Sequence, residues 1–186
     1  MLKFKYDEHK AISSLLYIAG HLIGLNDRKV KPDLHKVFKI LYFADQKHLA
    51  RYGRVIVGDF YIAMDHGPVP SNMYDMVKTV RGDSIYPDDR GYGDSFEVRD
   101  HYIRPRHEPD LQVLSESDIE CLNESLQENQ YLSFNELRDK SHDPAYCRAA
   151  KDDKISFRAM AKMGGADDEM LSYIQATAEN ERLLGI

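Results

Sequence analysis

Four polar side chains near the middle of the chain are of the types that bind metal ions. Asp45 and His48 lie close together in the sequence, and Asp65 and His66 follow further on. Two imidazoles with two carboxylates form a donor set for Zn²⁺, Mn²⁺ or Fe²⁺, so a metal-dependent hydrolase using Asp45, His48 and His66 is one hypothesis. Their spacing matches no known metal motif, and a histidine that fixes a turn through hydrogen bonds explains His66 better. We therefore predict no metal, no cofactor and no catalytic residue, and keep the hydrolase as the least favoured alternative.

The candidate nucleophiles lack the sequence context of catalytic sites. No serine lies in a Gly-x-Ser-x-Gly motif, and Cys121 and Cys147 match no nucleophile, metal or redox signature. Gly91 and Gly93 are flanked by aspartates, whose charge repels phosphate, so they do not indicate a nucleotide site. Two widely separated cysteines are typical of free thiols in a reducing compartment, and we expect a cytoplasmic protein without a signal peptide.

Asp45 is the most informative polar residue because it interrupts a stripe of apolar side chains. Burying an unpaired carboxylate costs several kcal/mol, so the fold must supply hydrogen-bond donors to it. We expect Asp45 to accept hydrogen bonds from the backbone around His66 and Gly67, or from the His66 ring. His48 and His142 are interpreted as two further buried structural polar residues. Steps of three and four residues place on one helix face Leu34, Phe38, Leu41, Asp45, His48 and Tyr52.

Hydrophobic periodicity and capping residues predict a helical majority. Asp7 is the expected N-cap of the first helix. The second helix begins near Pro32, which suits a first helical position, has Asp33 in its first turn and ends at Gly53. Ser71 is the expected N-cap of the third. The predicted helices cover 8–25, 32–52 and 71–81, with further starts at Ser115, Ser133 and about Asp167 and a final end at Gly185.

Short extended segments in the middle third predict a small β-structure. Residues 55–57 and 60–64 have the composition of strands, and 96–98 with 102–104 form a predicted hairpin that pairs with them. The Gly- and Asp-rich segment 83–95 is expected to be a mobile surface loop. We predict an α+β fold with a helix majority: a single compact domain, 1–186, of about six helices, with a small antiparallel β-sheet or hairpin inserted in its middle third.

Composition restricts the class of protein further. The chain has 186 residues, 42% of them hydrophobic, and a formal net charge of −6. These values are typical of one soluble globular domain, and they disfavour disorder and a membrane-spanning segment. The acidic balance makes nucleic acid an unlikely ligand without a partner protein and fits a basic protein partner better.

Several runs of residues form a pattern that extends over most of the chain. They are Lys39-Ile-Leu-Tyr-Phe-Ala-Asp45, His48-Leu49, Tyr52-Gly53-Arg54, Gly58-Asp59, Tyr61 to Pro70 with Tyr74, Leu114-Ser115 with Asp118, and Ser141-His142-Asp143-Pro144-Ala145-Tyr146. This pattern resembles the signature of the Panacea domain, the SocA-like antitoxins of bacterial and phage toxin–antitoxin pairs. Tyr146 departs from it, because the family more often has Trp there, and this departure concerns only the packing of the last helices.

The resemblance implies a non-enzymatic antitoxin that neutralises a cognate protein toxin by direct binding. Two related roles stay open: a proteolytic adaptor that carries the toxin to a protease or its unfoldase, and an autoregulator of a toxin–antitoxin operon. We also expect no membrane partner. It does not specify the toxin or the oligomeric state.

The segment from His66 to Pro70 supplies a physical mechanism for such a role. Two prolines give it a rigid, extended path, and a rigid segment loses little entropy when it docks on a partner. Apolar side chains beside it add contact area. The predicted partner-binding residues are Tyr61, His66, Gly67, Pro68, Val69, Pro70, Met73 and Tyr74.

Overall fold

The helix α2, Leu34–Tyr52, forms the centre of the fold. The computed structural model describes residues 4–184, with side chains up to Thr177. Most side chains of α2 are buried on every side of the helix, as expected for a helix that other elements surround. It packs against α1 (Glu8–Gly24), α4 (Glu116–Asn129), α5 (Phe134–Ser141), α7 (Phe157–Met163) and the strand β2 (Gly67–Pro70).

Local sequence determines where α2 begins and ends. The side chain of Asp33 accepts a hydrogen bond from the Lys36 amide at 2.9 Å, which makes Asp33 the N-cap. The predicted start at Pro32 was therefore wrong by two residues, because the capping side chain lies outside the helix. Gly53 ends the helix in the left-handed conformation, at φ 71°, as predicted.

Two separate antiparallel hairpins lie in the middle of the chain. Strand β1 (Tyr61–Met64) pairs with β2, and β3 (Phe96–Arg99) pairs with β4 (Tyr102–Pro105). The predicted pairing between the two hairpins was wrong. The second edge of β1 is taken by 153–155, because the Ala63 amide donates to Asp153 O and the Ile155 amide to Tyr61 O, each at 2.9 Å.

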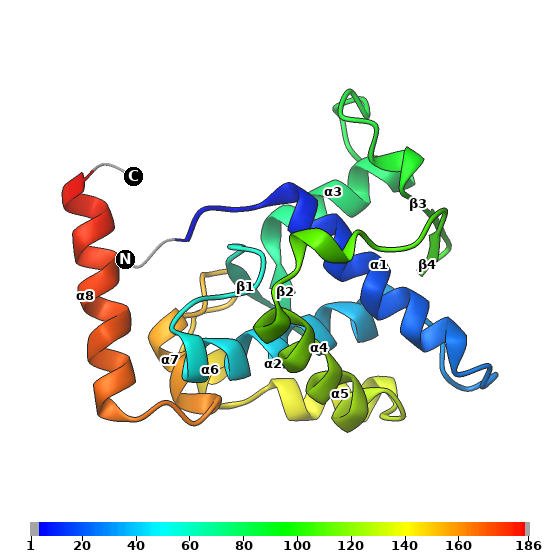
Figure 1. The fold of residues 1–186 in the computed structure, drawn as a ribbon. Helices are drawn as coiled ribbons and strands as arrows, with labels where there is room; N and C mark the ends of the chain where they lie inside the picture. Colours follow the sequence, from blue (N-terminus) through cyan, green and yellow to red (C-terminus); the bar gives the residue numbers. More distant parts are fainter. Residues whose placement is uncertain (1–3, 185–186) are drawn as a thin grey trace.

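The remaining elements surround this centre. They are α3 (Ser71–Arg81), α6 (Pro144–Cys147), α8 (Asp168–Leu184) and two short 3-10 turns at Tyr92–Asp94 and Leu111–Val113. Figure 1 shows α8 along one edge of the molecule and the β3–β4 hairpin at the opposite edge. The predicted α+β fold with a helix majority is confirmed, although the described residues form eight α-helices where about six were expected, since α6 and α7 are short.

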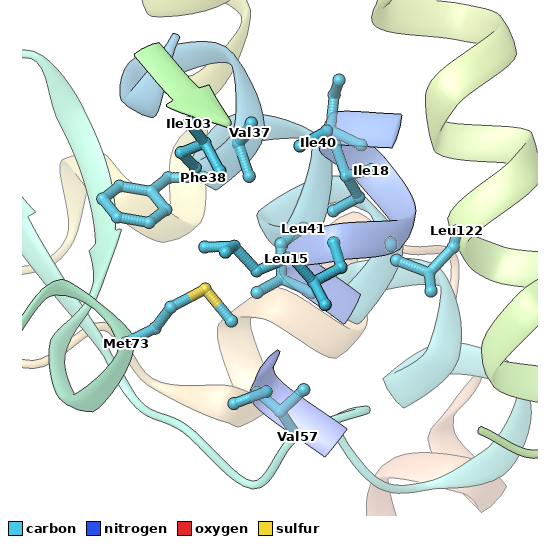
Figure 2. Packing of buried hydrophobic residues seen from close by; sticks show 14 of the residues in the cluster. Leu15, Ile18, Val37, Phe38, Ile40, Leu41, Val57, Met73, Ile103 and Leu122 are labelled. Atoms are coloured by element: carbon cyan, nitrogen blue, oxygen red, sulfur yellow. The ribbon is translucent and has the colours of Figure 1, made fainter. Parts of the chain in front are cut away.

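Buried side chains form two apolar clusters that meet at α2. In the first, Leu15 of α1, Leu41 of α2 and Met73 of α3 point toward one another (Figure 2). The second joins the other side of α2, including Tyr42, to Met160 of α7 and Ile174 of α8. Since both clusters use α2, a displacement of this helix disturbs the whole core.

Two predicted helix starts are confirmed, whereas one predicted N-cap and one predicted strand are not. Ser115 and Ser133 each form a complete capping box. Pro70 rather than Ser71 is the N-cap of α3, and it makes no side-chain hydrogen bond. Residues 55–57 are not a strand: the Ile56 amide donates to Asp45 Oδ1, and Val57 O accepts from the backbone amide of Asp7 instead of joining a ladder. The predicted helix end at Gly185 lies outside the described residues.

The loop from 83 to 95 is partly held by its own side chains. Asp88 accepts hydrogen bonds from the amides of Tyr92 and Gly93 at 2.9 and 2.7 Å. Its expected mobility stays a prediction. Among the described residues, no helix is long and apolar enough to cross a membrane.

A substitution at Gly164 tests the close packing of α7 on α2. A Cβ atom at this position would lie 1.9 Å from Gln46 O, whereas nothing lies within 4 Å of a Cβ atom at Gly20. We expect Gly164→Ala to lower the free energy of unfolding by about 2 kcal/mol or more, because the backbone of α2 must move. Gly20→Ala, the control at an exposed position of α1, should raise the free energy of unfolding by about 0.5 kcal/mol. Urea unfolding measures both, and a neutral Gly164→Ala would contradict this packing.

Candidate functional site

Asp45 lies at 0% exposure on α2, and both of its carboxylate oxygens are occupied. Oδ1 accepts a hydrogen bond from the Ile56 amide, and Oδ2 accepts one from the Tyr61 hydroxyl, each at 2.7 Å. Burial raises the pKa of Asp45 to about 6, and these two hydrogen bonds oppose the shift. The predicted burial of Asp45 is confirmed. The predicted partners around His66 and Gly67 were wrong, because Asp45 faces the start of β1 and the preceding segment.

His48 continues the same polar row one turn later. It is fully buried, as predicted, with Nδ1 2.9 Å from Arg54 O and Nε2 3.1 Å from Asp118 Oδ1. Lys10 and Arg54 also pair with Asp118, at 2.6 and 3.1 Å. Although burial opposes ionisation, the donors around Asp118 hold the pKa of its carboxyl group well below the usual range. This network fixes α1 and α4 to the end of α2.

Asp59 replaces the missing cap of α3. It is fully buried, and it accepts hydrogen bonds from the amides of Asn72 and Met73 at 3.0 and 2.9 Å. These are two of the first amides of the helix, which have no partner within the helix itself. The segment between α2 and β1 therefore positions α3 as well as the first hairpin.

Lys39 holds the second strand of the hairpin. Its side chain is 1% exposed, and Nζ donates a hydrogen bond to Pro68 O at 2.8 Å. Burial lowers the pKa of Lys39 to about 7. A Cβ atom at Gly67 would lie 2.9 Å from Lys39 Cε and 2.5 Å from Ser141 Oγ, so only glycine fits between α2 and α5.

Three side chains bind alternate carbonyl groups of the hairpin. Tyr146 donates to Met64 O at 2.9 Å, and the His35 ring lies 3.2 Å from His66 O. Together with the hydrogen bond from Lys39 to Pro68 O, these contacts hold the turn from α6 and from two positions of α2. The β1–β2 hairpin is therefore anchored from outside and does not depend on its own short ladder.

An aromatic surface lies beside this anchored turn. The exposed ring of His66 meets the Phe134 ring edge-on with centroids 5.4 Å apart, and the half-buried ring of His35 stacks on Phe134 at 4.0 Å. Phe134, the first residue of α5, is 46% exposed. We call His35, His66 and Phe134 the His66 surface.

The predicted partner-binding residues divide between core and surface. Only His66 is exposed, while Val69 and Tyr74 are half-buried. The ring of Tyr74 also contacts the Phe38 ring and the ammonium group of Lys78. The expectation that the remaining residues lie at the surface was wrong. Gly67 to Pro70 form a strand that packs on α2, and the first turn of α3 turns Met73 toward the core. The buried residues are Tyr61, Gly67, Pro68, Pro70 and Met73.

His142 is not the fully buried residue that was expected. Its ring is half-buried and stacks on Tyr146, with centroids 4.2 Å apart, while Nε2 is buried without a hydrogen-bond partner among the described residues. Burial and the nearby charge of Lys39 lower the pKa of His142. The stacking keeps the α5–α6 junction beside the hairpin.

The structure does not assemble the residues of the hydrolase alternative into a metal centre. The carboxylate of Asp45 binds Ile56 and Tyr61, and the ring of His48 contacts Arg54 O and Asp118. The ring of His66 instead contacts the Phe134 ring. No group of three or more His, Cys, Asp and Glu side chains in the described part of the chain is placed to hold a metal ion.

Three residues of the site were missed from the sequence. The sequence did offer a sign of the role of Lys39, because a lysine inside the apolar run of a buried helix needs a hydrogen-bond acceptor. His35 lies four residues before Lys39 and so shares its side of α2. Phe134 carried no signal, since its position depends on how α5 packs against the hairpin.

Comparison with known proteins finds a family match that covers this region. The family described as antitoxin SocA-like, Panacea domain, matches residues 37–147. The match begins in α2 and ends with α6, so it contains Asp45, the first hairpin and Phe134. Neither a curated protein sequence nor a solved structure matches the chain significantly.

Substitutions of Asp45 test its role as a structural acceptor. Asp45→Ala leaves a buried amide and a buried hydroxyl without an acceptor, so the free energy of unfolding should fall by about 2–5 kcal/mol. In Asp45→Asn the amide oxygen can accept from Ile56 while the amide nitrogen donates to the Tyr61 oxygen, and the loss should be less than half as large. Urea unfolding followed by circular dichroism gives both values. Equal losses, or no loss in Asp45→Ala, would refute the assignment.

The buried ammonium group of Lys39 predicts a specific pH dependence. Its pKa of about 7 lies below the usual 10.5, so between pH 7 and 9 the unfolded chain holds more protons at this residue than the folded chain. Stability must therefore rise with pH in this window, by ~2 kcal/mol from Lys39 alone. Lys39→Met lacks this contribution, while groups common to both proteins cancel in the comparison. Parallel pH profiles of wild type and Lys39→Met would contradict the prediction.

Proposed function

Because the chain belongs to the family of SocA-like antitoxins with a Panacea domain, we propose that it neutralises a cognate protein toxin by binding it directly, without catalysis. The family match carries this proposal. The contacts of Asp45 and Lys39 agree with it, because these two buried polar groups make structural hydrogen bonds to the hairpin and the segment before it.

The docking surface in this proposal is the His66 surface together with Val69 and Tyr74. An exposed aromatic residue supplies contact area with few rotatable bonds, and side-chain anchors hold the neighbouring hairpin. A surface that is already ordered before binding loses less entropy when the complex forms. Direct binding therefore needs no rearrangement of the fold.

The cellular setting is also part of the proposal. The two cysteines are free thiols, one buried and one exposed, as in a protein of a reducing compartment, and we place the chain in the cytoplasm. The adaptor hypothesis adds a protease or its unfoldase as a second partner.

Co-expression tests the proposed function. The protein encoded by the neighbouring gene is expressed alone, with this chain, and with a chain truncated by an early stop codon. We expect growth arrest by the neighbouring protein alone, relief only by the intact chain, and a complex that co-purifies through size-exclusion chromatography.

Two results would contradict direct neutralisation. Persistent arrest in the presence of the folded chain would remove the antitoxin role. Relief without a complex, accompanied by disappearance of the toxin that stops when a host protease is deleted, would instead assign the chain the adaptor role.

A further inference from the structure

The β3–β4 hairpin has two faces of different chemistry. Side chains alternate along each strand, so neighbouring positions point to opposite sides of the two-stranded ribbon. On the inner side, Phe96 and Ile103 are fully buried in the first apolar cluster. On the outer side, Glu97 and Arg104 face each other as a cross-strand pair. The apolar side therefore fixes the ribbon to the body of the protein and leaves the charged side outward.

Three guanidinium groups on this outer face share one carboxylate. The Glu97 carboxylate lies 3.1 Å from Arg99 Nε, 3.9 Å from Arg104 Nη1 and 3.6 Å from Arg106 Nη2. In the part of the chain that the structure describes, these arginines pair with no other carboxylate within 4.0 Å. Their side chains are between 54% and 64% exposed. Since arginine keeps its proton in proteins, two positive charges stay uncompensated in this cluster.

The segment before α2 brings a fourth cation to the same face. This segment runs beside β4, because the Ile103 amide donates to Pro32 O at 2.9 Å. Lys31 Nζ lies 5.1 Å from the centroid of the Tyr102 ring, in a cation–π contact. Tyr102 faces Arg99 across the hairpin, so the ammonium group of Lys31 extends the row of positive charges.

Acidic residues around the hairpin confine the positive charge to this face. Asp94 before β3 and Asp100 in the turn are exposed, and Asp33 is occupied as the N-cap of α2. Even with these residues counted, 26–33 and 96–107 together contain six Arg and Lys against four Asp and Glu. The charge of the face is therefore opposite to the net charge of −6 for the whole chain.

The length of the row favours a polyanion over a single anionic group. Arg106 extends the pairing by one position, since its amide donates to Ser95 O, and Arg99 lies four positions further along the same strand as Ser95. This separation is about 13 Å at the rise of a β-strand. Duplex DNA carries one charge per ~1.7 Å of its axis, so it meets such a row with several phosphates. Its major groove also admits a two-stranded β-ribbon, and arginine is the commonest specific contact there.

We infer that the outer face of the β3–β4 hairpin binds duplex DNA in the major groove, through Arg99, Arg104 and Arg106. In the free protein Glu97 serves as the internal counter-ion of these groups, and the phosphates compete with it in the complex. The inference goes beyond the proposed function and requires no toxin. It places nucleic-acid binding on one local face, although the average charge of the chain disfavours such a ligand.

Direct binding of the free, full-length chain to a short fluorescent DNA duplex of mixed sequence tests the inference. Anisotropy at several salt concentrations should give an affinity that falls with salt with a logarithmic slope of about three. Arg104→Ala should weaken binding about fivefold and reduce this slope by about one. Glu97→Gln should bind at least about twofold more tightly, because a carboxylate that competes with phosphate is removed. The matched control Arg158→Ala, at an exposed position of α7, should bind like wild type.

Four results would overturn the inference, provided that circular dichroism shows each variant to be folded. They are no salt-dependent binding of wild type, equal losses in Arg104→Ala and Arg158→Ala, no gain in Glu97→Gln, and equally effective competition by duplex RNA or polyglutamate. The last result would indicate general attraction of anions, because the deep, narrow major groove of duplex RNA does not admit the ribbon. None of them concerns toxin neutralisation, which co-expression tests separately.

Discussion

A carboxylate and an ammonium group remain buried on one central helix because the segment after that helix supplies their partners. Asp45 binds the Ile56 amide and the Tyr61 hydroxyl, and Lys39 binds Pro68 O. Tyr61 lies in β1 and Pro68 in β2, and these two strands pair with each other, so both polar contacts fix the same hairpin from α2. Since a buried polar group without a partner costs far more than a made hydrogen bond contributes, the hairpin and the helix must adopt their positions together.

This constraint gives the hairpin an order that four-residue strands do not reach alone. Its turn is positioned by α2, α5 and α6, and the aromatic rings of His66 and Phe134 meet there because those elements are fixed. Lys39 is itself inaccessible, and it contributes to this surface by holding the hairpin in place. The order of this surface therefore depends on internal polar contacts as much as on exposed residues.

Much of this architecture can be predicted from local patterns, whereas the partners of the buried polar groups cannot. The N-cap Asp7, the end of α2 at Gly53 and the helix starts at Ser115 and Ser133 are local features, and each was predicted. The burial of Asp45 also follows from periodicity. Its partners depend on the path of 53–60, which no local pattern specifies, and Pro68 was expected at the surface because its rigidity does not reveal which face is covered. The anchoring by Lys39 and the position of Phe134 arise from packing between distant segments.

Hydrogen–deuterium exchange on the free protein and its toxin complex tests the central claim most directly. The account predicts slow exchange of the Ile56 amide and of the β1–β2 amides already in the free protein, and added protection on binding confined to the turn at His66 and the start of α5. Rapid exchange of these amides in the free protein would contradict an anchored hairpin. Protection that appears only in a distant region, such as the loop 83–95, would contradict the docking surface.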